Sequence, residues 1–190
     1  MAGLVLVTAP VVEPVTLAEA KDHMRVDATT DDALIEALIL AARERVETFT
    51  GRALVTQTWD WTLDCFEPTL IVPKPPLASV TSITYVDSDG ASQTLASTVY
   101  QVDIKTQPAR IVEAYGQSWP TTREQLNAVT IRFVAGYGVA ASHVPMALRQ
   151  AALLLIGHWY REREDSARTE LRPIPSGAEA LMMPYYIARF

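Results

Sequence analysis

The stretch Thr29–Arg52, TTDDALIEALILAARERVETFTGR, decides how the rest of the chain is organised. Its apolar residues recur every three or four positions: Leu34/Ile35, Leu38/Ile39, Ala42, Val46 and Phe49. This spacing predicts a long amphipathic helix whose outer face carries the charged residues Glu36, Arg43, Glu44 and Glu47. Thr29 or Thr30 can cap the first amides, and Gly51 can end the helix in the left-handed conformation.

The composition is that of a folded protein and excludes several classes of function. Of the 190 residues, 49% are hydrophobic and 20% are charged, which excludes a mainly disordered chain. The net charge of −6 comes without a basic cluster, so direct binding of a nucleic-acid backbone is disfavoured. The single cysteine, Cys65, cannot form an internal disulfide, which suits a reducing cytoplasmic origin. We expect neither a secretory signal nor a membrane span.

The N-terminal region combines an extended arm with a short helix. Residues 1–15 are apolar and contain prolines, a composition typical of an extended arm. Thr16 and Glu19 have the spacing of a capping box, which predicts a helix over Leu17–Arg25. With the long helix, these elements form the first expected segment, residues 1–55, as part of a helical bundle.

The periodicity changes after Arg52. Trp59, Trp61, Leu63 and Cys65 alternate with polar residues, a pattern typical of a half-buried strand. Asp87–Gly90 (DSDG) is a hairpin turn signal. Further strands are expected at Ile71–Val72, Val80–Asp87, Gln93–Leu95, Val99–Asp103, Arg110–Glu113 and Val129–Tyr137. Residues 56–138 are therefore predicted to be a β-rich insertion of five to seven short strands.

Helical spacing returns at Val144 and predicts a C-terminal helix of the bundle within residues 139–170. Pro145 suits a first helical position. The expected buried stripe comprises Leu148, Ala151/Ala152, Leu155/Ile156 and Trp159. The fold class predicted from the whole pattern is α+β: two long helices and a short N-terminal helix, a β-rich insertion and an extended C-terminal tail.

The last segment, residues 171–190, contains three prolines, which argue against a long helix. It is also too apolar for a free tail, so it needs a surface to lie on. We predict an extended tail that docks on a partner or a neighbouring subunit, while docking on its own chain stays open as the alternative. The predicted docking residues are Leu181, Met182, Met183, Tyr185, Tyr186, Ile187 and Phe190.

No pattern in the chain indicates catalysis, a metal or a cofactor. The three histidines, His23, His143 and His158, have no metal-ligand spacing, and Cys65 is interpreted as a small buried hydrophobe. Gly136–Gly138 lacks the phosphate-loop pattern and is interpreted as a turn that ends a strand. The acidic pairs Asp31/Asp32 and Asp87/Asp89 fit a helix start and a turn. We predict no catalytic, metal-binding or cofactor-binding residues.

The order of the motifs resembles one family, the head–tail connector proteins (adaptors or head-completion proteins) of long-tailed phages, prophages and gene-transfer agents. The resemblance spans nearly the whole chain, although each motif by itself is weak. It is carried by Pro14–Asp27 (PVTLAEAKDHMRVD), Asp31–Ile39 (DDALIEALI), Ala41–Glu47 (AARERVE), Thr50–Leu54 (TGRAL), Pro75–Asp87 (PPLASVTSITYVD), Phe133–Gly138 (FVAGYG) and the helix around Gln150–Arg163.

The resemblance implies a structural protein without enzymatic activity. Such proteins form a ring, commonly dodecameric, beneath the portal, and extend the DNA channel towards a stopper or tail-completion protein. Their C-terminal segment commonly docks on the portal protein. The implied location is the virion neck, with the host cytoplasm during assembly. Double-stranded DNA would pass through the ring without specific binding, because an acidic wall repels phosphates. The β-rich insertion is larger than in the shortest relatives.

Two alternatives stay open at this point. Another neck protein, such as a stopper or a tail terminator, would also form a ring without catalysis, but it should be mostly β. A small cytoplasmic enzyme of unfamiliar type is the second alternative. An activity screen of variants at Cys65 and the histidines would reveal it.

Overall fold

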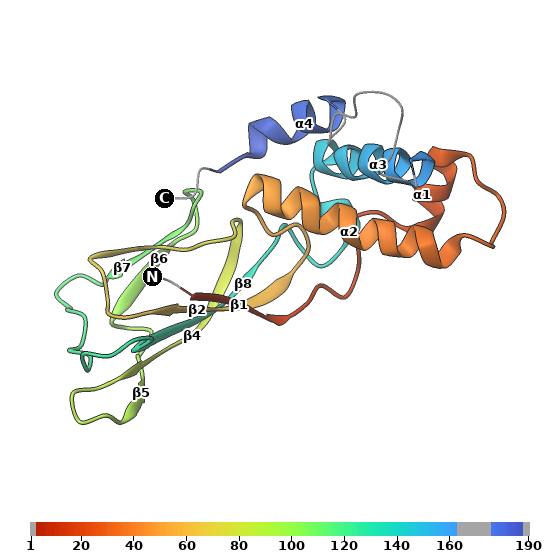
Figure 1. Ribbon diagram of the computed structural model, residues 1–190. Coiled ribbons are helices and arrows are strands. Elements are labelled where there is room, and N and C mark those ends of the chain that lie inside the picture. The colour runs from red at the N-terminus through yellow and green to blue at the C-terminus, as the bar shows by residue number, and fades with distance from the viewer. Residues whose placement is uncertain (1–2, 163–175, 188–190) are drawn as a thin grey trace. The chain divides into compact units, whose positions relative to one another are not determined.

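The computed structural model describes residues 3–162 and 176–187 (Figure 1). The chain divides into two compact units. One comprises Met1–Pro10 and Thr56–Tyr137, and the other Val11–Val55 and Gly138–Phe190. The described residues form four α helices and two antiparallel sheets, which confirms the expected α+β class. None of the helices in this part of the chain has the length and apolarity needed to span a bilayer.

Helix α1 (Leu17–Met24) begins at the predicted capping box. The Thr16 hydroxyl accepts a hydrogen bond from the Glu19 amide, while the Glu19 carboxylate accepts one from the Thr16 amide at 2.9 Å. These contacts satisfy amides that have no partner within the helix. The Thr16 amide is also the main reason that the pKa of Glu19 lies below its usual value.

Helix α2 (Asp32–Thr50) is the predicted long helix, and it ends at Gly51 with a positive φ of 73°. Its start differs from the prediction, because the N-cap is Asp31 and no side chain caps the first amides. Instead, the Asp32 amide donates to the Thr29 backbone carbonyl at 3.3 Å, which closes a turn before the helix.

The buried face of α2 is wider than its apolar stripe. Ile35, Ile39, Ala42 and Val46 are buried as predicted. The prediction that Arg43 and Glu47 face outward is wrong, since each is only 5% exposed. These two residues lie four positions apart and form an ion pair, so that their charges compensate each other within the fold.

Helix α3 (Met146–Arg161) buries Leu148, Ala151, Ala152, Leu155 and Ile156, whereas the predicted stripe residue Trp159 is only half-buried. Polar side chains join it to the first two helices. The Tyr160 hydroxyl donates to Asp31 of the α2 cap at 2.6 Å, and Arg149 pairs with Glu19 of α1. Lys21 of α1 also pairs with Asp32 of α2 at 2.6 Å. The three helices therefore form one packed group.

The unit formed by Met1–Pro10 and Thr56–Tyr137 contains both sheets, and we call it the β unit; the other is the helical unit. The larger sheet has the strand order β1-β2-β8-β4-β5. Its centre is formed by β2 (Gln57–Leu63), β8 (Val129–Ala135) and β4 (Leu77–Val86), with Phe133, Ile131 and Ile83 fully buried. At the edge, β1 (Gly3–Thr8) pairs with β2. The arm is thus extended over Gly3–Thr8, and bends occur between residues 11 and 15. Residues 3–8 belong to the sheet and not to the helical segment expected for residues 1–55.

The predicted turn at Asp87 joins β4 to β5 (Ser92–Thr94). The Asp87 carboxylate accepts hydrogen bonds from the backbone amides of Asp89 and Ala91, so this side chain stabilises the turn. The smaller sheet has the order β3-β7-β6, from Thr69–Ile71, Arg110–Glu113 and Tyr100–Asp103. All the expected strand positions are occupied, with ends shifted by a few residues.

Asp103, at the end of β6, is an acid whose pKa is strongly shifted. Hydrogen bonds from Arg110 (2.8 Å) and from the Lys105 amide (3.0 Å) lower the pKa of Asp103 from 3.8 to about 2. Since the folded pKa is depressed, the stabilisation is present above pH 3.8 and is lost as the pH falls through about 2.

We expect Arg110→Ala to move the pKa of Asp103 upward towards 3.8, because the main hydrogen bond to the carboxylate is removed. Lys105→Ala is the matched control, since it removes a nearby cation but leaves the donating backbone amide in place. The measurement is an NMR titration of the Asp103 carboxyl carbon. Equal pKa changes in both variants would show that the charge, and not the hydrogen bond, sets the value.

Candidate docking surface

The C-terminal segment, predicted to be an extended docking tail, is helical from Ser176 to Tyr185. Helix α4 (Ser176–Met182) is followed by the 3₁₀ turn η2 (Met183–Tyr185). The expectation of an extended conformation is therefore wrong for these residues. Prolines did not prevent the turn, because Pro184 occupies the first turn of η2, where no amide is needed.

Helix α4 packs against α3 and α2 of its own chain (Figure 1). Ala178 and Met182 lie four residues apart, on one face of the helix, and both are fully buried. A Cβ atom at Gly177 would lie 3.7 Å from Leu154 Cδ1, so the first turn of α4 runs close to α3. The alternative of docking on the chain itself is therefore realised for this part of the segment.

One backbone and one side-chain hydrogen bond fix the segment after α4 to the end of α2 and to Arg52 just after it. The Ile187 amide donates to the Thr50 carbonyl at 3.0 Å, and Arg52 Nε donates to the Tyr185 carbonyl at 2.7 Å. The Tyr186 ring meets the Phe49 ring edge-on, with the centroids 6.1 Å apart. Thr50 has one of the last carbonyls of α2, which lack partners within the helix, so the segment completes the helix end.

The predicted docking residues separate into three groups in the structure. Met182 is buried within its own unit, while Leu181, Tyr185 and Ile187 are half-buried. Met183 and Tyr186 are 57% and 54% exposed, and Phe190 lies outside the described residues. We call Met183 and Tyr186 the outer pair. They are the described residues of this segment with large apolar side chains available to a partner.

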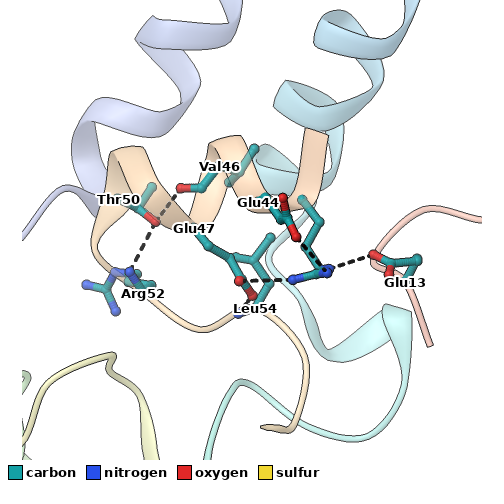
Figure 2. Close-up of polar contacts among 8 residues, drawn as sticks. Glu13, Glu44, Val46, Glu47, Thr50, Arg52 and Leu54 are labelled. Atoms are coloured by element: carbon teal, nitrogen blue, oxygen red, sulfur yellow. Dashed lines mark hydrogen bonds and ion pairs between the residues drawn. The ribbon is translucent and has the colours of Figure 1, made fainter. Parts of the chain in front are cut away.

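A polar cluster centred on the buried residues Arg43 and Glu47 lies on α2 (Figure 2). Arg43 pairs with Glu13 of the arm at 2.8 Å and with Glu47 at 3.2 Å. The Glu47 carboxylate also accepts a hydrogen bond from the Leu54 backbone amide at 2.9 Å. One arginine and one glutamate thus join the arm, the helix and the loop after the helix. Burial raises the pKa of Glu13, and the charge of Arg43 opposes this shift.

An open recess lies beside this cluster, within the helical unit. Its volume is about 550 Å³, and its lining is mainly apolar, with two acidic side chains: Val12, Glu13, Val15, Thr16, Leu17, Glu36, Ile39, Val139, Ala140 and Ala141. The sequence patterns do not indicate this recess, because its lining comes from the arm, the start of α1, α2 and the segment before α3. Val12 and Val139 are exposed apolar residues of this lining, but they follow no periodic pattern in the sequence that could have indicated it.

The described residues offer no metal site, since no group of three His, Cys, Asp or Glu side chains among them could hold an ion. Cys65 is exposed, which corrects its interpretation as a buried hydrophobe. The alternation that suggested burial stops at Leu63, where β2 ends. Gly136 and Gly138 follow β8 with positive φ, consistent with the predicted strand-ending turn.

Comparison with solved structures gives matches over almost the entire chain. The virion of a native gene transfer agent (GTA) particle contains a chain with 28% identity and a TM-score of 0.80, covering 98% of this chain and 96% of that one. The neck of an empty GTA particle, computed with C6 symmetry, gives 27% identity and a TM-score of 0.82, with 99% and 97% covered. The neck of a native GTA particle, computed with C12 symmetry, contains a chain with 27% identity and a TM-score of 0.77, covering 99% of this chain and 97% of that one.

No curated protein sequence matches the chain. A family model, by contrast, matches residues 13–170, from the arm that carries Glu13 through α3, and its description is "Head completion protein". Since this match spans most of the chain, the protein belongs to the head completion protein family, whose members are structural proteins and not enzymes.

Proposed function

We propose that this chain is the head–tail adaptor of a tailed phage, prophage or gene-transfer agent, and that it forms a ring in the virion neck. The observation that carries the proposal is the near-complete structural match to chains of GTA necks computed with sixfold and twelvefold symmetry. In the proposed assembly, a dodecameric ring lies beneath the portal protein, extends the DNA channel and joins the portal to a stopper or tail-completion protein.

The charge of the chain fits this role. The subunit carries a net charge of −6, so a ring of identical copies is strongly acidic. Acidic surfaces repel the phosphates of DNA, which lets a duplex pass without being held. A cyclic ring also places two different faces of each subunit in contact, so the contact surfaces need not be self-complementary.

The outer pair is the proposed contact with the portal or a neighbouring subunit. Met183 and Tyr186 are exposed, and the segment that carries them is fixed to α2 and α3 through Met182, Arg52 and Thr50. A pre-ordered segment loses less conformational entropy on binding than a free tail does. Methionine and tyrosine are also enriched at protein interfaces.

We expect the purified chain, mixed with its cognate portal protein, to form a complex that contains many copies of the chain. Native mass spectrometry gives the copy number, and particle images give the symmetry. A chain that stays monomeric and ignores the portal would contradict the proposal. A chain that binds only to a tail-side protein would favour a different position in the neck.

A further inference from the structure

Strand β1 is an exposed, apolar edge strand of the larger sheet, and it has few of the features that usually prevent an edge strand from pairing with another chain. In the part of the chain that the structure describes, β1 pairs with β2 on one side and no strand pairs with its other edge. Val5, Leu6 and Val7 are 59%, 40% and 44% exposed. Gly3–Thr8 (GLVLVT) contains no charged residue and no proline. Edge strands of soluble proteins normally use charges, prolines or short length to avoid pairing with other chains.

The opposite edge of the same sheet shows the contrast. There, β5 has only three residues, Ser92, Gln93 and Thr94, all polar and exposed. Strand β1 has six residues, and its irregularity is a shift in pairing between Leu6 and Thr8. Before this shift, Gly3–Leu6 pair one-to-one with β2, so the free edge is regular there. Alternate residues of such a strand direct their amides and carbonyls to the free side.

We propose that β1 pairs with an edge strand of a second copy of this chain, so that the sheet continues from one subunit into the next. The inference rests on the proposed function, because a ring brings each copy against its neighbour. The cyclic symmetry of the matched necks favours a second copy as the occupant, since a head-to-tail contact joins two different surfaces of the same chain. Each copy also carries other edge strands, namely β5, β3 and β6.

The chemistry of this contact is mainly that of the backbone. Main-chain hydrogen bonds supply affinity when one strand adds to an exposed sheet edge. The side chains of Val5, Leu6 and Val7 then lose contact with water, which adds a hydrophobic contribution. The contact therefore differs from that of the outer pair, which presents a methionine and a tyrosine without a free strand edge.

The first test is hydrogen–deuterium exchange of the wild-type chain, free and assembled with its portal. We expect the amides of residues 3–6 that face the free edge to exchange slowly only in the assembly. Multiple copies on the portal with unchanged exchange in β1 would overturn this inference and leave the proposed function standing. A chain that never assembles would overturn both.

The second test identifies the occupant. The photoreactive residue benzoylphenylalanine in place of Val5 should give, after irradiation of the assembly, a product at twice the chain mass of 20.9 kDa. A product that joins the chain to the portal instead would overturn the assignment of a second copy.

The third test uses a matched pair of lysine variants. Val5→Lys places a charge on the edge and should weaken ring assembly by about tenfold or more. Val11→Lys is the control, since Val11 is 94% exposed and lies outside the strand. Circular dichroism establishes that both variants are folded. Equal assembly by Val5→Lys, Val11→Lys and wild type would overturn the inference. If Val5→Lys fails to fold, the hydrogen–deuterium exchange of the wild-type chain and the cross-linking test decide whether β1 pairs with a second copy.

Discussion

Replacing Arg43 with alanine should lower the free energy of unfolding by about 3–5 kcal/mol. The guanidinium is buried and pairs with Glu13 at 2.8 Å and Glu47 at 3.2 Å (Figure 2). Without it, Glu47, which is only 5% exposed, would lose its ion pair with the Arg43 guanidinium. Glu47 would still accept a hydrogen bond from the Leu54 amide, but a neutral donor does not replace the charge of a buried guanidinium. The measurement is urea unfolding of the helical unit in the full chain.

Arg45→Ala is the matched control, because Arg45 lies on the exposed face of the same helix. Its free energy of unfolding should change by no more than about 0.5 kcal/mol. Equal losses in the two variants would show that burial of the Arg43 cluster does not stabilise the fold.

The effect of Arg43→Ala should also depend on pH. Burial already raises the pKa of Glu13 above 4.5, and loss of the opposing Arg43 charge raises it further. An acid with a raised folded pKa favours the folded state below its unfolded pKa, and this contribution is lost as the pH rises through the folded pKa. The destabilisation should therefore be smaller at pH 4.5 than at neutral pH. A difference that grows on acidification would contradict the assignment of Glu13 to this cluster.

Local signals in the sequence were sufficient for much of the fold. The capping box of Thr16 and Glu19 and the end of α2 at Gly51 each depend on a few neighbouring residues, and both are confirmed. The hairpin at Asp87 is of the same kind, since its carboxylate bonds to amides within the turn itself. Such features can be predicted because the interacting groups are close in sequence.

Features that depend on distant partners could not be predicted in this way. Arg43 is buried because Glu13, thirty positions earlier, supplies a counter-charge. Residues 3–8 of the arm form a sheet edge because β2, whose residues lie fifty or more positions later, pairs with them. Periodicity describes one element at a time, so it cannot indicate which polar residue finds a partner or which extended segment finds a strand.

The C-terminal segment was predicted to be extended from its apolar residues and prolines, but its described part is mostly helical. Its sequence indicates that the apolar residues need a surface and that the prolines oppose a long helix. A short helix of seven residues followed by a 3₁₀ turn satisfies both requirements, because Pro184 occupies the start of the turn. The sequence could not distinguish residues that pack on α2 and α3 from residues that stay available to a partner, since both kinds are apolar.

Two adjacent methionines separate these roles experimentally. Met182 is fully buried between α4 and the helices beneath it, whereas Met183 is 57% exposed. Met182→Ala should lower the free energy of unfolding by about 2–5 kcal/mol, because it removes a buried side chain and leaves a cavity. Met183→Ala should change it by no more than about 0.5 kcal/mol, because little of its contact area lies within the chain. Thermal unfolding of the isolated subunit measures both.

Association with the portal should depend on the exposed methionine, Met183, and should be measured on variants that stay folded. Met183→Ala, and more strongly the double variant Met183→Ala with Tyr186→Ala, should weaken association with the portal while the circular dichroism stays unchanged, because exposed apolar anchors gain their contacts only on binding. Loss of stability in Met183→Ala would mean that this side chain belongs to the core of its own subunit. A double variant that is stable and binds the portal as wild type does would show that the outer pair contributes no docking contact, and that the ring is joined to the portal through another surface.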